Sequence, residues 1–275
     1  MKSKISWVPL SPVACLAVGA ALLARSTAYA GNGSWNVDAD GTWSTDLNWN
    51  PAAAPGTAAG DIVALTNNVT AERTITLDAV SPTLGTLFIG DPASSYFGYT
   101  LAASGGAGLT FNNSGSDAVL AQTNNSSVTD TLSVPITLED NLVVASRATL
   151  SLSGVISGSG KGLTKTGAGT LILSGANTYG GATTVMGGGT LQLDATDTLP
   201  VTGALTLGST NEAGKAGNLI LNNFSQTLPS LLVASTNATV TDIVTIGPGQ
   251  TLALNGAGGL FVGANSATNK ACTTA

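Results

Sequence analysis

The chain has no histidine and only two cysteines. The absence of histidine excludes a Ser-His-Asp triad, an imidazole general base and every metal site that uses a histidine ligand. Cys15 lies within the first thirty residues, so Cys272 is the one thiol expected in the mature chain, where it can form no internal disulfide. Catalysis and metal binding therefore have few side chains available, and we predict neither an enzyme activity nor a cofactor.

Charge is also scarce. Charged residues make up 9% of the 275 residues, and nine lysines and arginines stand against fifteen aspartates and glutamates. A phosphate backbone requires a basic patch, so this balance argues against a nucleic-acid partner. Beyond the first thirty residues, no apolar run approaches the roughly 18 residues of a membrane-spanning helix. We therefore predict no membrane span in the mature chain.

The first thirty residues have the order of a secretory signal peptide. Lys2 and Lys4 precede an apolar run over residues 13–23, and the Ala-Tyr-Ala sequence at 28–30 has the small-x-small form of a signal-peptidase site. We predict that residues 1–30 are removed and that the mature chain is exported to the cell surface or the medium.

What the chain does contain is a recurring pair of leucines separated by one residue. The two leucines of such a pair point to one face of a strand, which indicates a half-buried strand. Gly, Asn or Asp follows each pair, and the early pairs recur at intervals of about 20 residues, a length typical of repeat units. The pattern predicts a solenoid of stacked parallel β-coils. The pairs are Leu150/Leu152, Leu171/Leu173, Leu191/Leu193, Leu205/Leu207, Leu219/Leu221 and Leu252/Leu254.

A β-sandwich built from the same strands is the structural alternative. It would need tight antiparallel hairpins, for which Asn-Gly is the strongest local signal. Asn255-Gly256 is the one such dipeptide in the strand region, besides Asn32-Gly33 at its start. The sequence therefore favours the all-β parallel β-helix over the sandwich.

Residues 31–100 differ from the rest because they hold Trp35, Trp43 and Trp49. A solenoid exposes its end coil and needs a cap, so we predict that residues 31–100 form an N-terminal cap and the first strands. Coils would then follow over residues 101–275. The alternative is that the three tryptophans stack on a sugar ligand, although buried structural aromatics are more common.

Residues 158–193, GSGKGLTKTGAGTLILSGANTYGGATTVMGGGTLQL, resemble the autotransporter-associated β-strand repeat, which is also called the passenger-associated transport repeat. The pattern has a Gly-Leu-x-Lys start, an Asn-Thr-Tyr centre and a Gly-Thr-Leu-x-Leu finish. The residues that fill it are Gly162, Leu163, Lys165, Gly167, Gly169, Thr170, Leu171, Leu173, Ser174, Gly175, Asn177, Thr178, Tyr179, Thr183, Thr184, Val185, Gly189, Thr190, Leu191 and Leu193.

This resemblance implies a right-handed parallel β-helix of the kind found in exported autotransporter passengers. It also implies an extracellular or cell-surface location in a Gram-negative-type bacterium. The match is specific, and it covers about one full repeat.

Several polar clusters are possible chemical sites. Asp38, Asp40 and Asp46 offer oxygen ligands for Ca²⁺, but a full Asp-x-Asp-x-Asp-Gly order is absent. The pairs Glu139/Asp140 and Asp194/Asp197 could serve glycoside hydrolysis. However, Glu139 and Asp140 are adjacent on a strand and point to opposite faces, and Asp194 and Asp197 flank a predicted turn, where solvation is the simpler interpretation. Residues 154–162 lack the spacing of a phosphate-binding loop. Lys161 and Lys165 are predicted to be solvated.

We therefore expect a structural or adhesin-like β-helix whose outward Thr, Ser and Asn rows contact a cell surface or a polysaccharide. The alternative is an extracellular β-helix that binds or cleaves carbohydrate. An uncapped coil end is an open strand edge, so self-association through the ends of the β-helix is a further expectation.

Overall fold

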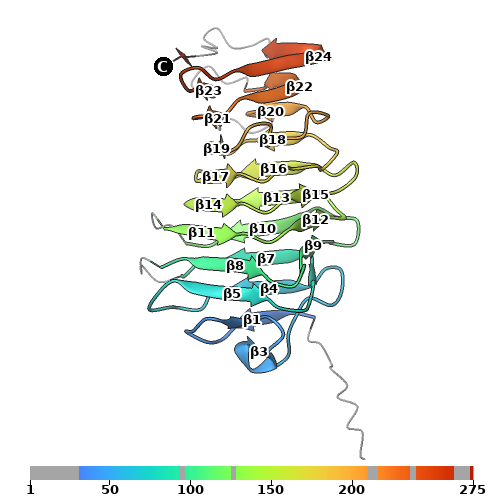
Figure 1. Cartoon of the computed structure of the whole chain (residues 1–275), viewed down its shortest axis with the longest axis vertical. Helices are drawn as coiled ribbons and strands as arrows, with labels where there is room; N and C mark the ends of the chain where they lie inside the picture. Colours follow the sequence, from blue (N-terminus) through green and yellow to red (C-terminus); the bar gives the residue numbers. More distant parts are fainter. Residues whose placement is uncertain are drawn as a thin grey trace, which may run out of the picture.

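The computed structural model describes residues 31–92, 97–124, 128–209, 216–235, 240–262 and 273–274. Three sheets run along one axis, so the chain rises coil by coil from its N-terminal part to its C-terminal part (Figure 1). The predicted signal peptide and Cys272 lie outside the described residues. Within those residues, no helix is both long and apolar enough to cross a membrane.

The first sheet takes one strand from each coil and a second strand, β3, from the first coil. Its order begins at the N-terminal end with β3, which is preceded by the short 3-10 helix η1 (Asp46–Asn48). The strands in spatial order are β3 (Trp49–Asn50), β1 (Gly33–Trp35), β4 (Ile62–Leu65), β7 (Thr86–Ile89), β10 (Ala118–Gln122), β13 (Leu142–Ala145), β16 (Leu163–Thr166), β18 (Thr183–Val185), β20 (Leu205–Leu207), β22 (Gln226–Val233) and β24 (Leu252–Val262).

The second sheet also takes one strand from each coil, and the third sheet is confined to the first half of the stack. The second consists of β2 (Gly41–Thr42), β5 (Arg73–Leu77), β8 (Tyr99–Ala103), β11 (Thr129–Leu132), β14 (Thr149–Leu152), β17 (Thr170–Leu173), β19 (Gly189–Leu193), β21 (Gly217–Leu221), β23 (Ile243–Ile246) and β25 (Thr273–Thr274). The third consists of β6 (Thr83–Leu84), β9 (Leu109–Phe111), β12 (Ile136–Leu138) and β15 (Ile156–Ser157).

Strands of successive coils pair in parallel, and within the described residues only β1 and β3 pair antiparallel. Parallel neighbours need a long connection between them, which here is the remainder of a coil. This pairing confirms the parallel β-helix and shows that the β-sandwich alternative is wrong.

The predicted leucine pairs lie in register across neighbouring coils. In the second sheet, Leu150 pairs with Leu171, Leu171 with Leu191, and Leu191 with Leu219. These four side chains are fully buried. Equivalent side chains of successive coils stack at the strand spacing of about 4.8 Å. They fill the interior of the β-helix, so no separate sheet is needed to cover it.

The coil length varies more than the sequence predicted. Around the repeat, Leu163 pairs with Thr183. Nearer the N-terminus, Leu87 pairs with Leu120, so the chain between these two partners is clearly longer. The strands keep their register in both places, because the additional residues lie in the connections at the corners. The period of the leucine pairs therefore describes the repeat coil and not the whole rod.

Candidate functional site

The three tryptophans meet at the N-terminal end of the stack. The Trp43 and Trp49 rings lie 4.6 Å apart at 61°, and the Trp35 and Trp49 rings lie 5.2 Å apart at 88°. Both are edge-to-face arrangements, which aromatic pairs favour. The side chains are 0–2% exposed. No ring face is open to solvent, so the rings cannot stack on a sugar in this arrangement.

Hydrogen bonds fix two of the three indoles. Trp49 Nε1 donates to the Trp43 carbonyl at 2.8 Å, and Trp43 Nε1 donates to the Pro55 carbonyl at 2.9 Å. Trp35 Nε1 is buried without a partner among the described residues. Burial at the end of the stack is what a capping role requires, and the capping role itself remains a prediction.

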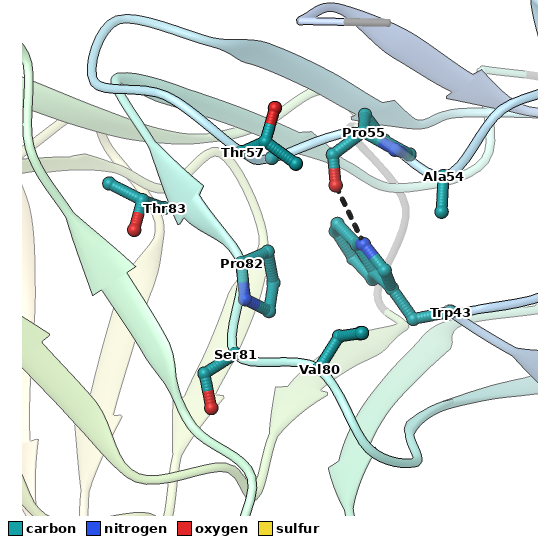
Figure 2. Close-up of a pocket in the computed structure, with 9 residues that line it drawn as sticks. Trp43, Ala54, Pro55, Thr57, Val80, Ser81, Pro82 and Thr83 are labelled. Atoms are coloured by element: carbon teal, nitrogen blue, oxygen red, sulfur yellow. Dashed lines mark hydrogen bonds between the residues drawn. The ribbon is translucent and has the colours of Figure 1, made fainter. Parts of the chain in front are cut away.

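A cavity of about 290 Å³ opens beside Trp43, between the loop over residues 54–57 and the corner over residues 80–83 (Figure 2). Pro55 and Pro82 contribute apolar surface. Thr83 N donates to the Gly56 carbonyl at 2.9 Å and joins the two segments. The lining contains no acidic or basic side chain. It consists of Trp43, Ala54, Pro55, Gly56, Thr57, Val80, Ser81, Pro82 and Thr83. Such a cavity fits a small uncharged group but supplies no acid or base.

The motif residues of the repeat lie on β16, β17, β18 and β19, in two successive coils, and turn mostly inward. Leu163, Leu171, Leu191 and Leu193 are fully buried or nearly so. Thr170 and Thr190 pair across neighbouring strands of the second sheet and face outward. The structure therefore uses the apolar motif positions for stacking between coils.

The prediction that Lys165 is solvated is wrong. Its side chain is 0% exposed, and its neighbours in the adjoining coils are Val144 and Val185. Its Nζ donates to the carbonyls of Thr166 at 2.8 Å and Gly167 at 2.7 Å. Burial lowers the pKa of Lys165 to about 8, because the charged ammonium loses solvation. Lys161, by contrast, is partly exposed and forms an ion pair with Asp140 at 3.7 Å.

The sequence contained the signal that Lys165 is buried. Leu163 and Lys165 are separated by a single residue, so on a strand they share a face. If Leu163 points into the core, Lys165 must do so as well. The aliphatic stem of lysine suits an apolar column, and the head can reach the carbonyls at the next corner.

Gly189 is the residue that makes room for the Lys165 ammonium. A Cβ atom added to Gly189 would lie 2.2 Å from Lys165 Nζ and 2.2 Å from the carbonyl oxygen of Gly167. Two motif positions that are far apart in the sequence therefore depend on each other. The lysine requires a glycine in the following coil, which accounts physically for the presence of both in the motif.

The Asn-Thr-Tyr centre of the repeat replaces the third sheet where that sheet ends. Asn177 Oδ1 accepts from Ile156 N at 2.7 Å, and its Nδ2 donates to the Thr198 carbonyl at 3.0 Å. Tyr179 and Thr183 share a buried hydroxyl–hydroxyl hydrogen bond of 2.6 Å. One side-chain amide thus connects the coil below to the coil above, in addition to backbone hydrogen bonds such as that from Thr178 N to the Ile156 carbonyl at 2.8 Å.

The carboxylates considered as calcium ligands or hydrolytic pairs each accept hydrogen bonds from different neighbouring groups. Asp38 accepts from Thr70 and Arg73, Asp40 from Thr74 N, and Asp46 from Ala54 N. No group of three or more metal-binding side chains occurs within the residues that the structure describes.

The two hydrolytic pairs are also engaged by nearby groups. Asp140 accepts from the backbone of Gly115 and Asn113, which, with Lys161 nearby, holds its pKa below the usual range. Glu139 accepts from the Asn112 amide. Asp194 accepts from Gln192, and Asp197 accepts from Thr227 N.

Sequence reasoning missed Asp130, which is fully buried in line with Leu150. It accepts from Tyr99 N at 2.8 Å, Gln122 Nε2 at 2.8 Å and Asn124 Nδ2 at 3.0 Å. Desolvation raises its pKa in spite of these donors. A buried carboxylate with three donors ties together the backbone around β8 and β10. Its place on the same strand face as the inward Leu132 was the available signal.

Comparison with known proteins matches residues 163–193 to the family model of the passenger-associated transport repeat. This match confirms the resemblance to autotransporter passenger repeats over strands β16 to β19. In the searches of curated proteins and of solved structures, none matches the chain.

Proposed function

We propose that this protein is an exported β-helical passenger with a structural, adhesin-like role and without catalytic activity. The observation that carries the proposal is the passenger-associated transport repeat, whose motif residues stack two successive coils on each other. Its most unusual members, Lys165 and Gly189, serve packing between coils. The signal peptide over residues 1–30 belongs to this proposal and provides the route of export.

The outer surface offers rows of hydroxyl groups in place of a shaped site. Thr164, Thr184 and Thr206 are aligned on the first sheet, one in each of three successive coils. On the second sheet, Thr149, Thr170 and Thr190 are aligned in the same way. Hydroxyls that repeat at about 4.8 Å can make many weak, uncharged contacts with a neutral polysaccharide or a cell surface.

The test is to follow the protein in its own cells and then to measure adhesion. We expect protease added to intact cells to reach the protein, and its mass to correspond to a chain that has lost residues 1–30. Beads coated with the mature chain should bind cells or neutral polysaccharide. Replacing Thr164, Thr184 and Thr206 with valine should reduce bead binding several-fold. A matched variant with valine at the buried Thr183 is the control for altered packing.

Either of two results would contradict this proposal. The first is a protein that stays inside the cell with residues 1–30 intact. The second is bead binding that the three outward substitutions leave unchanged while the fold is retained.

A carbohydrate-binding role is the second candidate, and the cavity beside Trp43 favours it. Its apolar proline surface and its Thr57, Ser81 and Thr83 hydroxyls suit a neutral ring. Because Trp43 lines this cavity, an occupant should change the tryptophan fluorescence. Titration with a panel of neutral glycans should then give a saturable change that Pro82→Arg abolishes. No change across the panel would argue against this role.

A further inference from the structure

Asp61 is a buried acidic residue near the N-terminal end of the stack, where it is 8% exposed. Its Oδ2 accepts from Thr57 N at 2.9 Å and from Ala58 N at 3.1 Å, and its backbone carbonyl accepts from Gly85 N at 2.8 Å. Neither of the two ion pairs within the described residues involves Asp61. A buried charge is costly unless it is paired and hydrogen-bonded. The second carboxylate oxygen, Oδ1, is therefore the atom at which a positive charge would best compensate for the burial.

Gly31 lies against this second oxygen. A Cβ atom added to Gly31 would be 2.7 Å from Asp61 Oδ1 and 3.4 Å from Asp61 Cγ. The next residue is held in place, because Asn32 Oδ1 accepts from Ile62 N at 2.8 Å. The Gly31 nitrogen and the added Cβ atom are both substituents of the same Cα atom. Rotation about the Cα–C bond of Gly31 therefore moves the nitrogen to the position of that Cβ atom.

The predicted signal-peptidase cleavage changes the chemistry of this nitrogen. Hydrolysis of the Ala30–Gly31 bond consumes one water molecule and leaves a carboxylate on Ala30 and an ammonium on Gly31. Before cleavage the nitrogen is an uncharged amide whose rotation must carry residues 1–30 with it. After cleavage the ammonium is free to take the position 2.7 Å from Asp61 Oδ1, which is the length of a hydrogen bond between an ammonium and a carboxylate.

We propose that removal of the signal peptide creates an ion pair between the Gly31 ammonium and the Asp61 carboxylate, and that this ion pair completes the N-terminal end of the rod. The ion pair depends on the export proposed above, with cleavage after residue 30. The precursor that retains residues 1–30 lacks the ammonium, so its first coil is held more weakly. Full stability of this end is then reached only after export.

The ion pair should also affect the cavity beside Trp43. Thr57 and Ala58 donate to the same carboxylate, and Thr57 lines the cavity. A carboxylate that is fixed by the Gly31 ammonium holds both backbone donors in place. The loop over residues 54–57 should therefore be better ordered in the exported protein than in the precursor.

The test compares the mature chain, which begins at Gly31 with a free amine, with the same chain acetylated at that amine. Acetylation removes the charge and should lower the thermal unfolding midpoint, followed by tryptophan fluorescence, by about 2–5 °C. In Asp61→Asn, which keeps an oxygen for Thr57 and Ala58, acetylation should change the midpoint by less than about 1 °C. The matched control is Asp46→Asn, because Asp46 also accepts from a backbone N–H of this end. Acetylation of this control should lower the midpoint as much as in the parent.

The reactivity of the Gly31 amine provides a second measurement, which a purely structural role of Asp61 would not change. A carboxylate beside the ammonium keeps it protonated and so lowers the share of the reactive neutral amine. At pH 7, acylation of the Gly31 amine should be about tenfold slower in the parent than in Asp61→Asn. If Asp61→Asn does not fold, the parent unfolded in urea supplies the reference rate.

Equal midpoints for the free and acetylated parent chains, or equal acylation rates, would overturn the ion pair. An exported protein whose first residue is not Gly31 would also overturn it, while the display function would stand. A protein that keeps residues 1–30 in its own cells contradicts the proposed function instead. In that case the two purified chains still decide whether the ammonium and Asp61 interact.

Discussion

The N-terminal end and the repeat coil are stabilised in different ways. At the N-terminal end, each contact occurs once: Trp43 packs on Trp49, and the Trp43 indole binds the Pro55 carbonyl. In the repeat coil, Leu171 packs between Leu150 and Leu191, and the same contact recurs along the rod. The comparison shows that one-off aromatic contacts hold the N-terminal end, whereas repeated aliphatic contacts hold the coils that follow.

The largest effect on the free energy of unfolding is expected at the N-terminal end. Trp43→Ala removes a buried ring and its hydrogen bond to Pro55, and should lower the free energy of unfolding by about 3–5 kcal/mol. Leu171→Ala is the matched change within the repeating columns, with an expected loss of about 2–4 kcal/mol. Denaturant unfolding measures both. A loss below about 1 kcal/mol for Trp43→Ala would mean that the tryptophan cluster does not stabilise this end.

Gly189→Ala tests the coupling between two motif positions in the repeat. The added methyl group would collide with Lys165 Nζ and with the Gly167 carbonyl, so we expect a loss of about 2–4 kcal/mol. The adjacent Gly188 is the control. Its φ is +79°, but a Cβ there meets nothing within 4 Å, so Gly188→Ala should cost about 1 kcal/mol from backbone strain alone. Equal losses for the two variants would contradict a steric role for Lys165.

Lys165 sharpens the comparison, because it places an ionisable group inside the repeating columns of the core. Its contribution to the stability should therefore depend on pH. The pKa is about 8 in the folded state and near 10.4 in the unfolded chain. Between these values the unfolded state binds more protons, so the stability should rise with pH from about 8 to 10.5. The full rise corresponds to roughly 3 kcal/mol.

Unfolding at several pH values, compared with Lys165→Met, isolates this contribution from the tyrosines that also titrate at high pH. As the pH rises, the unfolding free energy of the protein with Lys165 should increase relative to that of Lys165→Met. Parallel pH profiles for the two proteins would show that Lys165 has an ordinary pKa.

The smallest effect is expected from Asp38→Asn at the N-terminal end. Hydrogen bonds from Thr70 and Arg73 hold the pKa of Asp38 below its usual value, so its contribution is present at neutral pH and is lost as the pH falls through the folded pKa. Because the group is exposed, screening leaves little net stabilisation. The unfolding midpoint at pH 7 should shift only slightly, and a large shift would mean that this ion pair is a main support of the first coils.

The stacking of the coils could be predicted from the sequence, because the leucine pairs determine both the strand period and the inward face. The inward position of Lys165 follows from the same alternation, even though lysine is usually a surface residue. The roles of Asn177 and Asp130 could not be predicted in this way. Each connects residues of different coils, and which residues meet depends on corner lengths that vary from coil to coil.

The cavity beside Trp43 was also beyond sequence reasoning. It forms because the loop over residues 54–57 and the corner over residues 80–83 approach each other from successive coils. Neither segment carries a periodic pattern, and both contain proline, which marks a turn without fixing its direction. The periodicity of the sequence therefore predicts the columns of the core. The conformations of the irregular corners could be seen only in the structure.

The equal offsets around the repeat have a consequence for how such a chain can change its length. Leu163 pairs with Thr183 and Leu171 pairs with Leu191, so the interval along the chain is the same in both sheets. A duplication of this interval would insert one whole coil, and every existing neighbour would find an equivalent partner above and below. A deletion of the same interval would do the reverse. The length of the rod can then change in whole coils, with no need to alter either end.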